Sequence, residues 1–140
     1  MKKILFMAFL SVFALNVQAQ SLTNTEIVQV KGIYDFQTEF NEYRVNSFLK
    51  YQLEEAGFQV YYDTQEMPAE VKADPCKELK CIVTRDKSML ATKLNIKLIN
   101  CKGDVVFTAD GESRLKVRDK SHVDAIKDAL EYSALKNLRK

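Results

Sequence analysis

Apolar and polar residues alternate along the chain from Ala91 to Ala109, with a glycine-containing break between two alternating segments. Side chains of a β-strand point to opposite faces in turn, so this pattern predicts two strands that each have one apolar face. Gly103 can adopt the positive φ of a tight turn, so the two strands should form a hairpin. The apolar face consists of Leu94, Ile96, Leu98, Val105, Phe107 and Ala109. Other elements must cover this face.

The N-terminal half predicts a strand, a helix and a second strand. Apolar residues interleave with polar ones over residues 26–33, as in a strand. A helix follows, with Asp35 or Thr38 as its candidate N-cap, and Gly57 ends it. Residues 58–62 have the composition of a strand. The helical residues spaced for an inward face are Phe40, Val45, Phe48, Leu49, Leu53 and Ala56.

The remaining segments predict one more strand and a final helix. Residues 63–80 are irregular, residues 81–84 begin a strand, and a turn follows near residues 86–90. After the hairpin, residues 110–114 interrupt the alternation, and the Asp-Gly pair there is typical of a turn. Ser121 is the candidate N-cap of the last helix. Its apolar stripe consists of Val123, Ile126, Ala129, Leu130, Ala134 and Leu138.

In chain order these elements are β-α-β-β-β-β-α, which predicts an α+β two-layer sandwich. Both helices would lie on one face of a mostly antiparallel sheet and cover its apolar side chains. The chain has no internal repeat, low-complexity tract or linker, so residues 20–140 are expected to form a single domain.

The first 19 residues have the features of a cleaved signal peptide. Lys2 and Lys3 precede a short apolar run, and Ala19 supplies the small residue before a cleavage site. The run is shorter than the roughly 20 apolar residues of a membrane-spanning helix. We therefore expect residues 1–19 to be removed and the protein to be exported, periplasmic or secreted, without a stable membrane anchor.

The charge balance argues against two classes of partner. The full chain has 21 basic and 19 acidic residues, and removal of Lys2 and Lys3 leaves 19 of each. A net charge near zero predicts neither nucleic acid nor an anionic membrane as a partner.

Three cysteines, Cys76, Cys81 and Cys101, allow at most one internal disulfide in an oxidising compartment. An antiparallel pairing through a short turn at residues 88–89 places Cys76 opposite Cys101, which favours that bond and leaves Cys81 free and buried. A bond between Cys76 and Cys81 is the main alternative. No metal site is predicted, because the cysteine spacing lacks a second ligand pair and the single histidine, His122, is distant in sequence.

The sequence predicts no catalytic site and no cofactor. Ser121, His122 and Asp124 are close in sequence, but neighbouring residues at a helix start point in different directions and do not predict a triad. His122 is expected to be an exposed residue of the first helical turn. The chain also lacks a phosphate loop, a dinucleotide-binding glycine turn and a zinc-protease motif.

The aromatic residues are expected to belong to the core and the sheet faces rather than to a binding groove. They include Tyr34, Phe36, Phe40, Tyr43, Tyr61 and Tyr62. Strand alternation places Tyr61 on the helix-free face, where it would be exposed. The candidate contact residues for a protein partner are Tyr61, Gly111, Glu112, Ser113, Arg114 and Lys116, because an open sheet face and its edge strand are common binding surfaces.

Residues spread over the mature chain carry a resemblance to other exported proteins. They are Glu42–Asn46, Gly57, Phe58, Pro68, Cys76, Thr92, Lys93, Cys101, Gly111–Arg114, Lys116, Ala125, Ala129 and Leu130. Through them the chain resembles a small family of uncharacterised exported proteins from flavobacteria-like Gram-negative bacteria. It departs from that family at Val117 and Arg118, where an aromatic residue is expected. The resemblance implies the Cys76–Cys101 disulfide and implies no activity.

The element order is also similar to that of small periplasmic modules of envelope lipoproteins, which bind other proteins. Such a similarity of fold says little about function. The sequence as a whole predicts an exported non-enzymatic domain that contacts an envelope or secreted protein. The alternative is a protein that binds a small hydrophobic ligand between its helices and sheet, which requires a pocket of more than about 300 Å³.

Overall fold

The structure is a computed structural model that describes residues 27–87, 90–131 and 133–137. The expected signal peptide and the turn residues Ser88 and Met89 lie outside the described residues.

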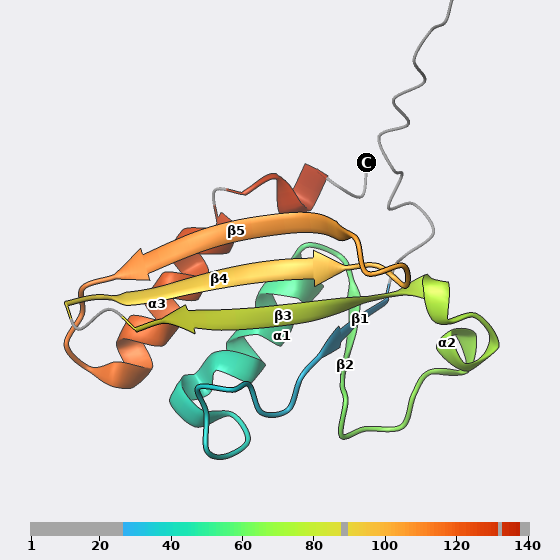
Figure 1. The fold of residues 1–140 in the computed structure, drawn as a ribbon, viewed down its shortest axis with the longest axis horizontal. Coiled ribbons are helices and arrows are strands. Elements are labelled where there is room, and N and C mark those ends of the chain that lie inside the picture. Colours follow the sequence, from blue (N-terminus) through green and yellow to red (C-terminus); the bar gives the residue numbers. More distant parts are fainter. Residues whose placement is uncertain (1–26, 88–89, 132, 138–140) are drawn as a thin grey trace, which may run out of the picture.

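Five strands form one mixed sheet in the order β2-β1-β3-β4-β5 (Figure 1). β1 (Ile27–Val30) runs parallel to β2 (Gln59–Tyr62) and to β3 (Glu78–Asp86), whereas β4 (Thr92–Ile99) is antiparallel to β3 and to β5 (Val105–Ser113). The predicted α+β class and element order are confirmed. The parallel pairings are more numerous than the sequence suggested, because a helix that connects two neighbouring strands returns the chain to the same end of the sheet.

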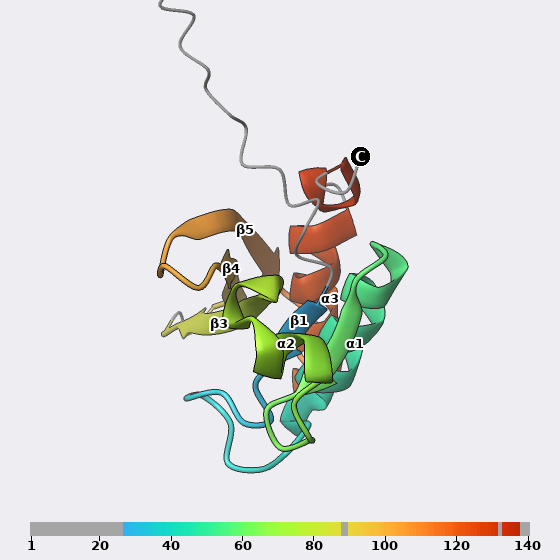
Figure 2. The ribbon, with the colours of Figure 1, turned by 90° about the vertical axis from the view of Figure 1, so that its right-hand side faces the viewer.

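The two long helices, α1 (Val45–Glu55) and α3 (Arg118–Glu131), cover one face of the sheet (Figure 2). Apolar residues at helical spacing on α1 and α3 meet the inward residues of the strands, as predicted for Leu49, Leu53 and Ile126 among others. Val123 and Ala134 were also predicted to face the core but are not part of it, and the predicted Leu138 lies outside the described residues. The 3-10 turn η4 (Ala134–Asn137) adds Leu135 to the same core. Fully buried members of this core include Val28, Val30, Val45, Leu49, Leu53, Leu79, Leu94, Ile96, Leu98 and Ile126.

A second, smaller apolar cluster lies on the opposite face of the sheet and contradicts the prediction for Tyr61. Tyr61 is only 6% exposed, because the short helix α2 (Ala69–Ala73) places Val71 against it and against Ile27. The Tyr61 hydroxyl donates a hydrogen bond to the Glu78 carboxylate and accepts one from Gln29 Nε2 at 3.0 Å. Tyr61 is therefore a structural residue at this position.

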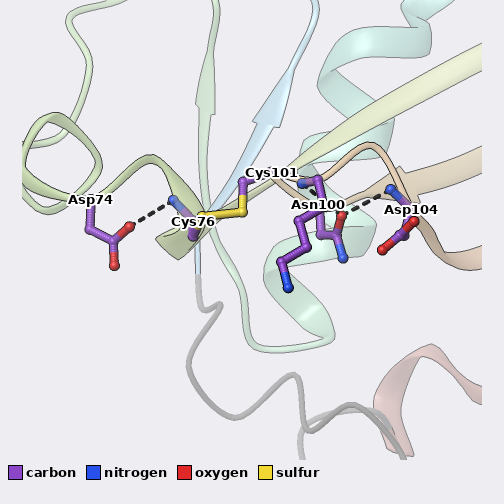
Figure 3. Close-up of a disulfide and its surroundings, with 6 residues drawn as sticks. Asp74, Cys76, Asn100, Cys101 and Asp104 are labelled. Carbon is purple, nitrogen blue, oxygen red and sulfur yellow. Dashed lines mark hydrogen bonds between the residues drawn. A yellow bond between two sulfur atoms is a disulfide. The ribbon is translucent and has the colours of Figure 1, made fainter.

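The predicted disulfide between Cys76 and Cys101 is present (Figure 3). Cys81 is free and buried, as predicted. Cys76 lies in the 3-10 turn η3 (Pro75–Lys77), and its backbone N–H donates to the Asp74 carboxylate at 3.0 Å. The strand register differs from the predicted one by two residues, since Cys81 pairs with Leu98 rather than with Ile96. A two-residue shift keeps every side chain on its face, so the buried pattern is unchanged.

The first helix is shorter than predicted, since it begins at Val45 and residues 31–41 form no helix or strand. Phe40 was expected to face the core but is 50% exposed. Its ring meets the Tyr62 ring edge to face, with the ring centroids 5.1 Å apart. Buried polar side chains explain the irregular path. Asn46 donates to the carbonyl oxygens of Lys31 at 2.6 Å and of Gly32 at 2.9 Å, which satisfies backbone groups that a helix would otherwise pair.

Two other boundaries also differ from the sequence predictions. β5 continues without a turn through residues 110–113, and α3 begins at Arg118, three residues before the predicted cap. Ser121 thus lies inside the helix, where its hydroxyl donates to the Arg118 carbonyl oxygen at 2.9 Å. Among the described residues, no helix has both the length and the apolar character needed to cross a membrane.

Candidate functional site

The structure divides the predicted contact segment into buried and exposed residues. Gly111 and Ser113 are buried under α3, whereas Glu112, Arg114 and Lys116 are exposed. Gly111 is buried because the helix passes directly over it, so that a Cβ atom there would lie 1.8 Å from the carbonyl oxygen of Ala125. The contact prediction is therefore wrong for Gly111 and Ser113 as well as for Tyr61, because these three residues are not accessible to a partner.

The exposed residues Arg114 and Lys116 line a cavity of about 690 Å³, which we call the basic pocket. It lies where β3 ends, β4 begins and the chain passes from β5 into α3. These ends of β3, β4 and β5 lie together at the left of the ribbon in Figure 1. Its lining residues are Tyr43, Arg85, Asp86, Lys87, Leu90, Ala91, Thr92, Arg114, Leu115, Lys116, Arg118, Ser121 and His122.

Positive charge dominates the lining of the basic pocket. Five cationic side chains line it, and Asp86 is its single acidic residue. Arg114 Nε lies 3.5 Å from a carboxylate oxygen of Glu112, but the other four cations form no ion pair with any described residue. These four are Arg85, Lys87, Lys116 and Arg118. Four cations without an ion-pair partner among the described residues therefore line one cavity.

Aromatic rings form one wall beside the pocket. The His122 ring stacks on Tyr43 with centroids 4.2 Å apart, and Phe36 lies 6.0 Å away on a similar plane. The Arg85 guanidinium lies over the rings of Phe36 and Tyr43, at 5.2 and 5.9 Å from their centroids. Cation–π contacts of this kind hold a guanidinium in place without neutralising it. Arg85 is therefore positioned at the pocket while its charge remains available to a ligand.

The hydrogen bonds of His122 define its protonation state. His122 Nδ1 lies 2.7 Å from the Arg118 carbonyl oxygen, which can only accept, and His122 Nε2 lies 3.3 Å from Arg85 Nη1, which can only donate. Both contacts are satisfied together only by a neutral ring that carries its proton on Nδ1. Burial lowers the pKa of His122, and the neighbouring Arg85 charge lowers it further. His122 was predicted to be exposed, but it is only 2% exposed and serves as a neutral support for Arg85.

Tyr43 reaches the pocket from a backbone segment with unusual dihedral angles. Asn41, Tyr43 and Arg44 have φ values of 60°, 58° and 61°, a region that costs non-glycine residues of the order of 1 kcal/mol or more each. The segment is held by the buried Gln37, whose Nε2 atom donates to the Glu42 carbonyl oxygen at 2.9 Å and to Asn46 Oδ1 at 2.7 Å. Strained residues often occur at functional sites.

Other groups with potential reactivity are unsuited to catalysis here. The Cys81 thiol is buried and has no access to solvent. Burial raises its pKa to about 12, so the thiol stays protonated. Ser121 accepts from the Thr92 hydroxyl at 2.9 Å and donates to backbone, an arrangement of structural hydrogen bonds. Within the described part of the chain, no group of three or more histidine, cysteine or acidic residues could hold a metal ion.

Two further cavities lie along the sheet. One of about 540 Å³ is lined mainly by polar residues of β3, β4 and β5, and one of about 260 Å³ lies beside β1 and β3. Between the helices and the sheet, the side chains of the apolar core are buried against one another. The described residues therefore give no support to the alternative of a hydrophobic ligand in the core.

No protein-family model matches the chain, and neither does any curated protein sequence. Among solved structures, the chain is similar to the PelC dodecamer from Paraburkholderia phytofirmans, with 16% identity over 76% of this chain and 85% of that chain and a TM-score of 0.46. A single-residue variant of that PelC is 18% identical over 76% of this chain and 84% of that chain, with a TM-score of 0.47. Likeness at this level carries no argument about function.

Sequence reasoning found Arg114 and Lys116 but missed Arg85, Tyr43 and the role of His122. Arg85 continues the alternation of β3 on the core face, which could have placed it next to the helices. No local signal marks Tyr43, because its position depends on the fold of the loop that precedes α1.

Proposed function

We propose that the chain is an exported, non-catalytic binding domain of the cell envelope, and that it recognises a negatively charged group with the basic pocket. One observation carries this proposal: four cations without ion-pair partners line a single cavity of a size typical of ligand sites. Fixed cations of this kind attract an anion, but arginine and lysine at neutral pH do not act as general bases.

The Cys76–Cys101 disulfide supports export. Disulfides persist in the periplasm and outside the cell and are rare in the reducing cytosol. The free cysteine, Cys81, is buried and protonated, so it does not compete for the bond. The signal-peptide features of residues 1–19 agree with this location.

Several lining groups suit a phosphate, sulfate or carboxylate group. Arg85, Arg114 and Arg118 each present a planar fork of donors that can bind two oxygens at once, and Lys87 and Lys116 add mobile point charges. The neutral His122 helps to hold Arg85, so the binding geometry is partly formed before a ligand arrives. A preformed site loses less conformational entropy on binding.

A titration of the mature domain with inorganic phosphate, followed by backbone amide NMR shifts, tests this function. We expect shifts at residues 85–87 and 114–122 that saturate with phosphate. In Lys87→Gln/Lys116→Gln the affinity for phosphate, measured from these shifts, should fall by about an order of magnitude, because each lost lysine removes an attractive charge.

The matched control is Lys77→Gln/Lys102→Gln, which removes two exposed lysines near the disulfide and leaves the basic pocket intact. It should bind phosphate like the unaltered domain. Equal weakening in both double variants would show that only overall charge matters, and an absence of saturable shifts at the pocket would refute the proposed function.

A further inference from the structure

Exposed apolar side chains lie in the two loops beside the basic pocket. Leu90 is 91% exposed and Leu115 is 52% exposed, and both line the pocket from different loops. Val117, 56% exposed, lies between the two cationic residues Lys116 and Arg118. We call Leu90, Leu115 and Val117 the apolar rim.

The apolar rim is not part of the apolar core of the described domain. None of its three residues belongs to either apolar cluster. Isolated exposed apolar residues are common, but these three lie in two loops that meet at one cavity and are interspersed with unpaired cations. Apolar side chains next to lysine and arginine are typical of surfaces that rest in the headgroup region of an anionic membrane.

We propose that this end of the domain docks on an anionic phospholipid surface, with a lipid phosphate in the basic pocket and the apolar rim at the boundary of the acyl chains. The inference rests on the proposed function, since it names the source of the anion that the pocket binds. Docking of this kind is peripheral and reversible, because three apolar side chains bury far less surface than a spanning helix.

The apolar rim is what favours a lipid over an acidic protein or a soluble anion. A soluble phosphate would be bound by the cations alone and would leave Leu90 in water. A lipid surface rewards both features at once, because burial of each apolar side chain adds to the attraction between the cations and the headgroups. The net charge of the mature chain gave no reason to expect this partner; the local distribution of charge does.

The test is sedimentation of the mature domain with vesicles made of equal parts phosphatidylglycerol and phosphatidylcholine, compared with vesicles of phosphatidylcholine alone. We expect binding to the anionic vesicles only, and weaker binding at high salt. Lys87→Gln/Lys116→Gln should weaken it by about fivefold for each lysine removed. Leu90→Ser/Leu115→Ser should weaken it by tenfold or more.

Two controls remove the same chemistry elsewhere. Lys77→Gln/Lys102→Gln changes the same number of charges near the disulfide, and Val105→Ser replaces an apolar residue that is 50% exposed at the start of β5. Both should bind anionic vesicles as the unaltered domain does. Circular dichroism and urea unfolding confirm that each variant is folded.

The outcomes separate this inference from the proposed function. If inorganic phosphate shifts the pocket residues but no vesicle binds, or if Leu90→Ser/Leu115→Ser binds vesicles normally, the lipid proposal fails and the pocket serves a soluble or protein-borne anion. If neither phosphate nor vesicles bind, both proposals fail. Loss of vesicle binding in both Lys87→Gln/Lys116→Gln and Leu90→Ser/Leu115→Ser, with both controls unchanged, supports docking on a lipid surface.

Discussion

The Nε2 atom of His122 accepts a hydrogen bond from Arg85 at 3.3 Å, so a neutral histidine on α3 holds a cationic side chain of β3. These residues are 37 positions apart in sequence and meet only because α3 packs across the end of the sheet. Tyr43 completes the arrangement by stacking on the histidine ring. The contact joins the two elements that form opposite sides of the basic pocket.

Stability should fall as the solution becomes mildly acidic. An unfolded histidine has a pKa of about 6.5, and burial together with Arg85 lowers the value in the folded state. Below about pH 6.5 the unfolded chain therefore binds a proton that the folded chain does not, so the free energy of unfolding decreases; above that pH the effect vanishes. Urea unfolding between about pH 8 and pH 5.5 measures this dependence.

The groups that face His122 are Arg85 from β3, Tyr43 from η2 (Glu42–Arg44), and Arg118 and Asp119 from α3. His122→Gln removes the titrating ring and should be less stable at neutral pH but nearly independent of pH in this window. His122 is the single histidine of the chain, so no other imidazole obscures the result. A variant that keeps the original pH dependence would show that His122 is not its source.

Replacement of Gly111 by alanine should loosen the packing of α3 on the sheet. The added Cβ atom would lie 1.8 Å from the Ala125 carbonyl oxygen and 2.9 Å from the Ala129 side chain, so the helix must move. Overpacking of this kind costs about 1–3 kcal/mol and sometimes more. We expect a loss of at least about 3 kcal/mol in urea unfolding, because the clash is with the backbone.

Gly103→Ala is the matched comparison. Gly103 has a φ of 83° but nothing within 4 Å of an added Cβ, so alanine there meets only the backbone penalty of about 1–2 kcal/mol. Similar losses in the two variants would argue against close contact between Gly111 and α3.

The strands and helices were predictable where one face is buried and the other is wet. β4 shows this best, since its alternating residues are buried and partly exposed in the order that the sequence gives. Gly111 was not predictable in the same way. An Asp-Gly pair signals a turn locally, but here the absence of a side chain allows α3 to lie against β5, a contact between distant segments.

The candidate site was less predictable than the fold, for a similar reason. Arg114 and Lys116 were identified as contact candidates near an edge strand, but Arg85 and Tyr43 come from other elements and join them only in three dimensions. The disulfide was correctly predicted even though the strand register was shifted by two residues. Cys76 and Cys101 both lie beyond the ends of the β3–β4 pairing, where the chain can accommodate such a shift.

Arg44→Gly should stabilise the protein. Arg44 is exposed and has a φ of 61°, a conformation that glycine adopts freely. Relief of the left-handed strain outweighs the greater entropy of an unfolded glycine, which leaves a net gain of up to about 1 kcal/mol in urea unfolding. Lys50→Gly, within regular α1, should instead lose about 1 kcal/mol of helix propensity, and it also removes the contacts of Lys50 with Glu54 and the Tyr62 ring. Equal losses in the two variants would mean that position 44 carries no strain.

Removal of the Cys76–Cys101 disulfide should lower the free energy of unfolding by about 3 kcal/mol, because the bond closes a loop across 25 positions and restricts the unfolded chain. Cys76→Ala/Cys101→Ala should unfold in urea like the reduced protein and should not respond to a reductant. Cys81→Ala keeps the bond and should still respond.

The native turns should persist without the disulfide, since Asn100 Oδ1 still accepts from the backbone N–H groups of Lys102 and Asp104 at 3.0 and 2.9 Å. A double variant as stable as the oxidised protein would show that the loop is already restricted in the unfolded state, and the disulfide would then be evidence of an oxidising compartment but not a source of stability.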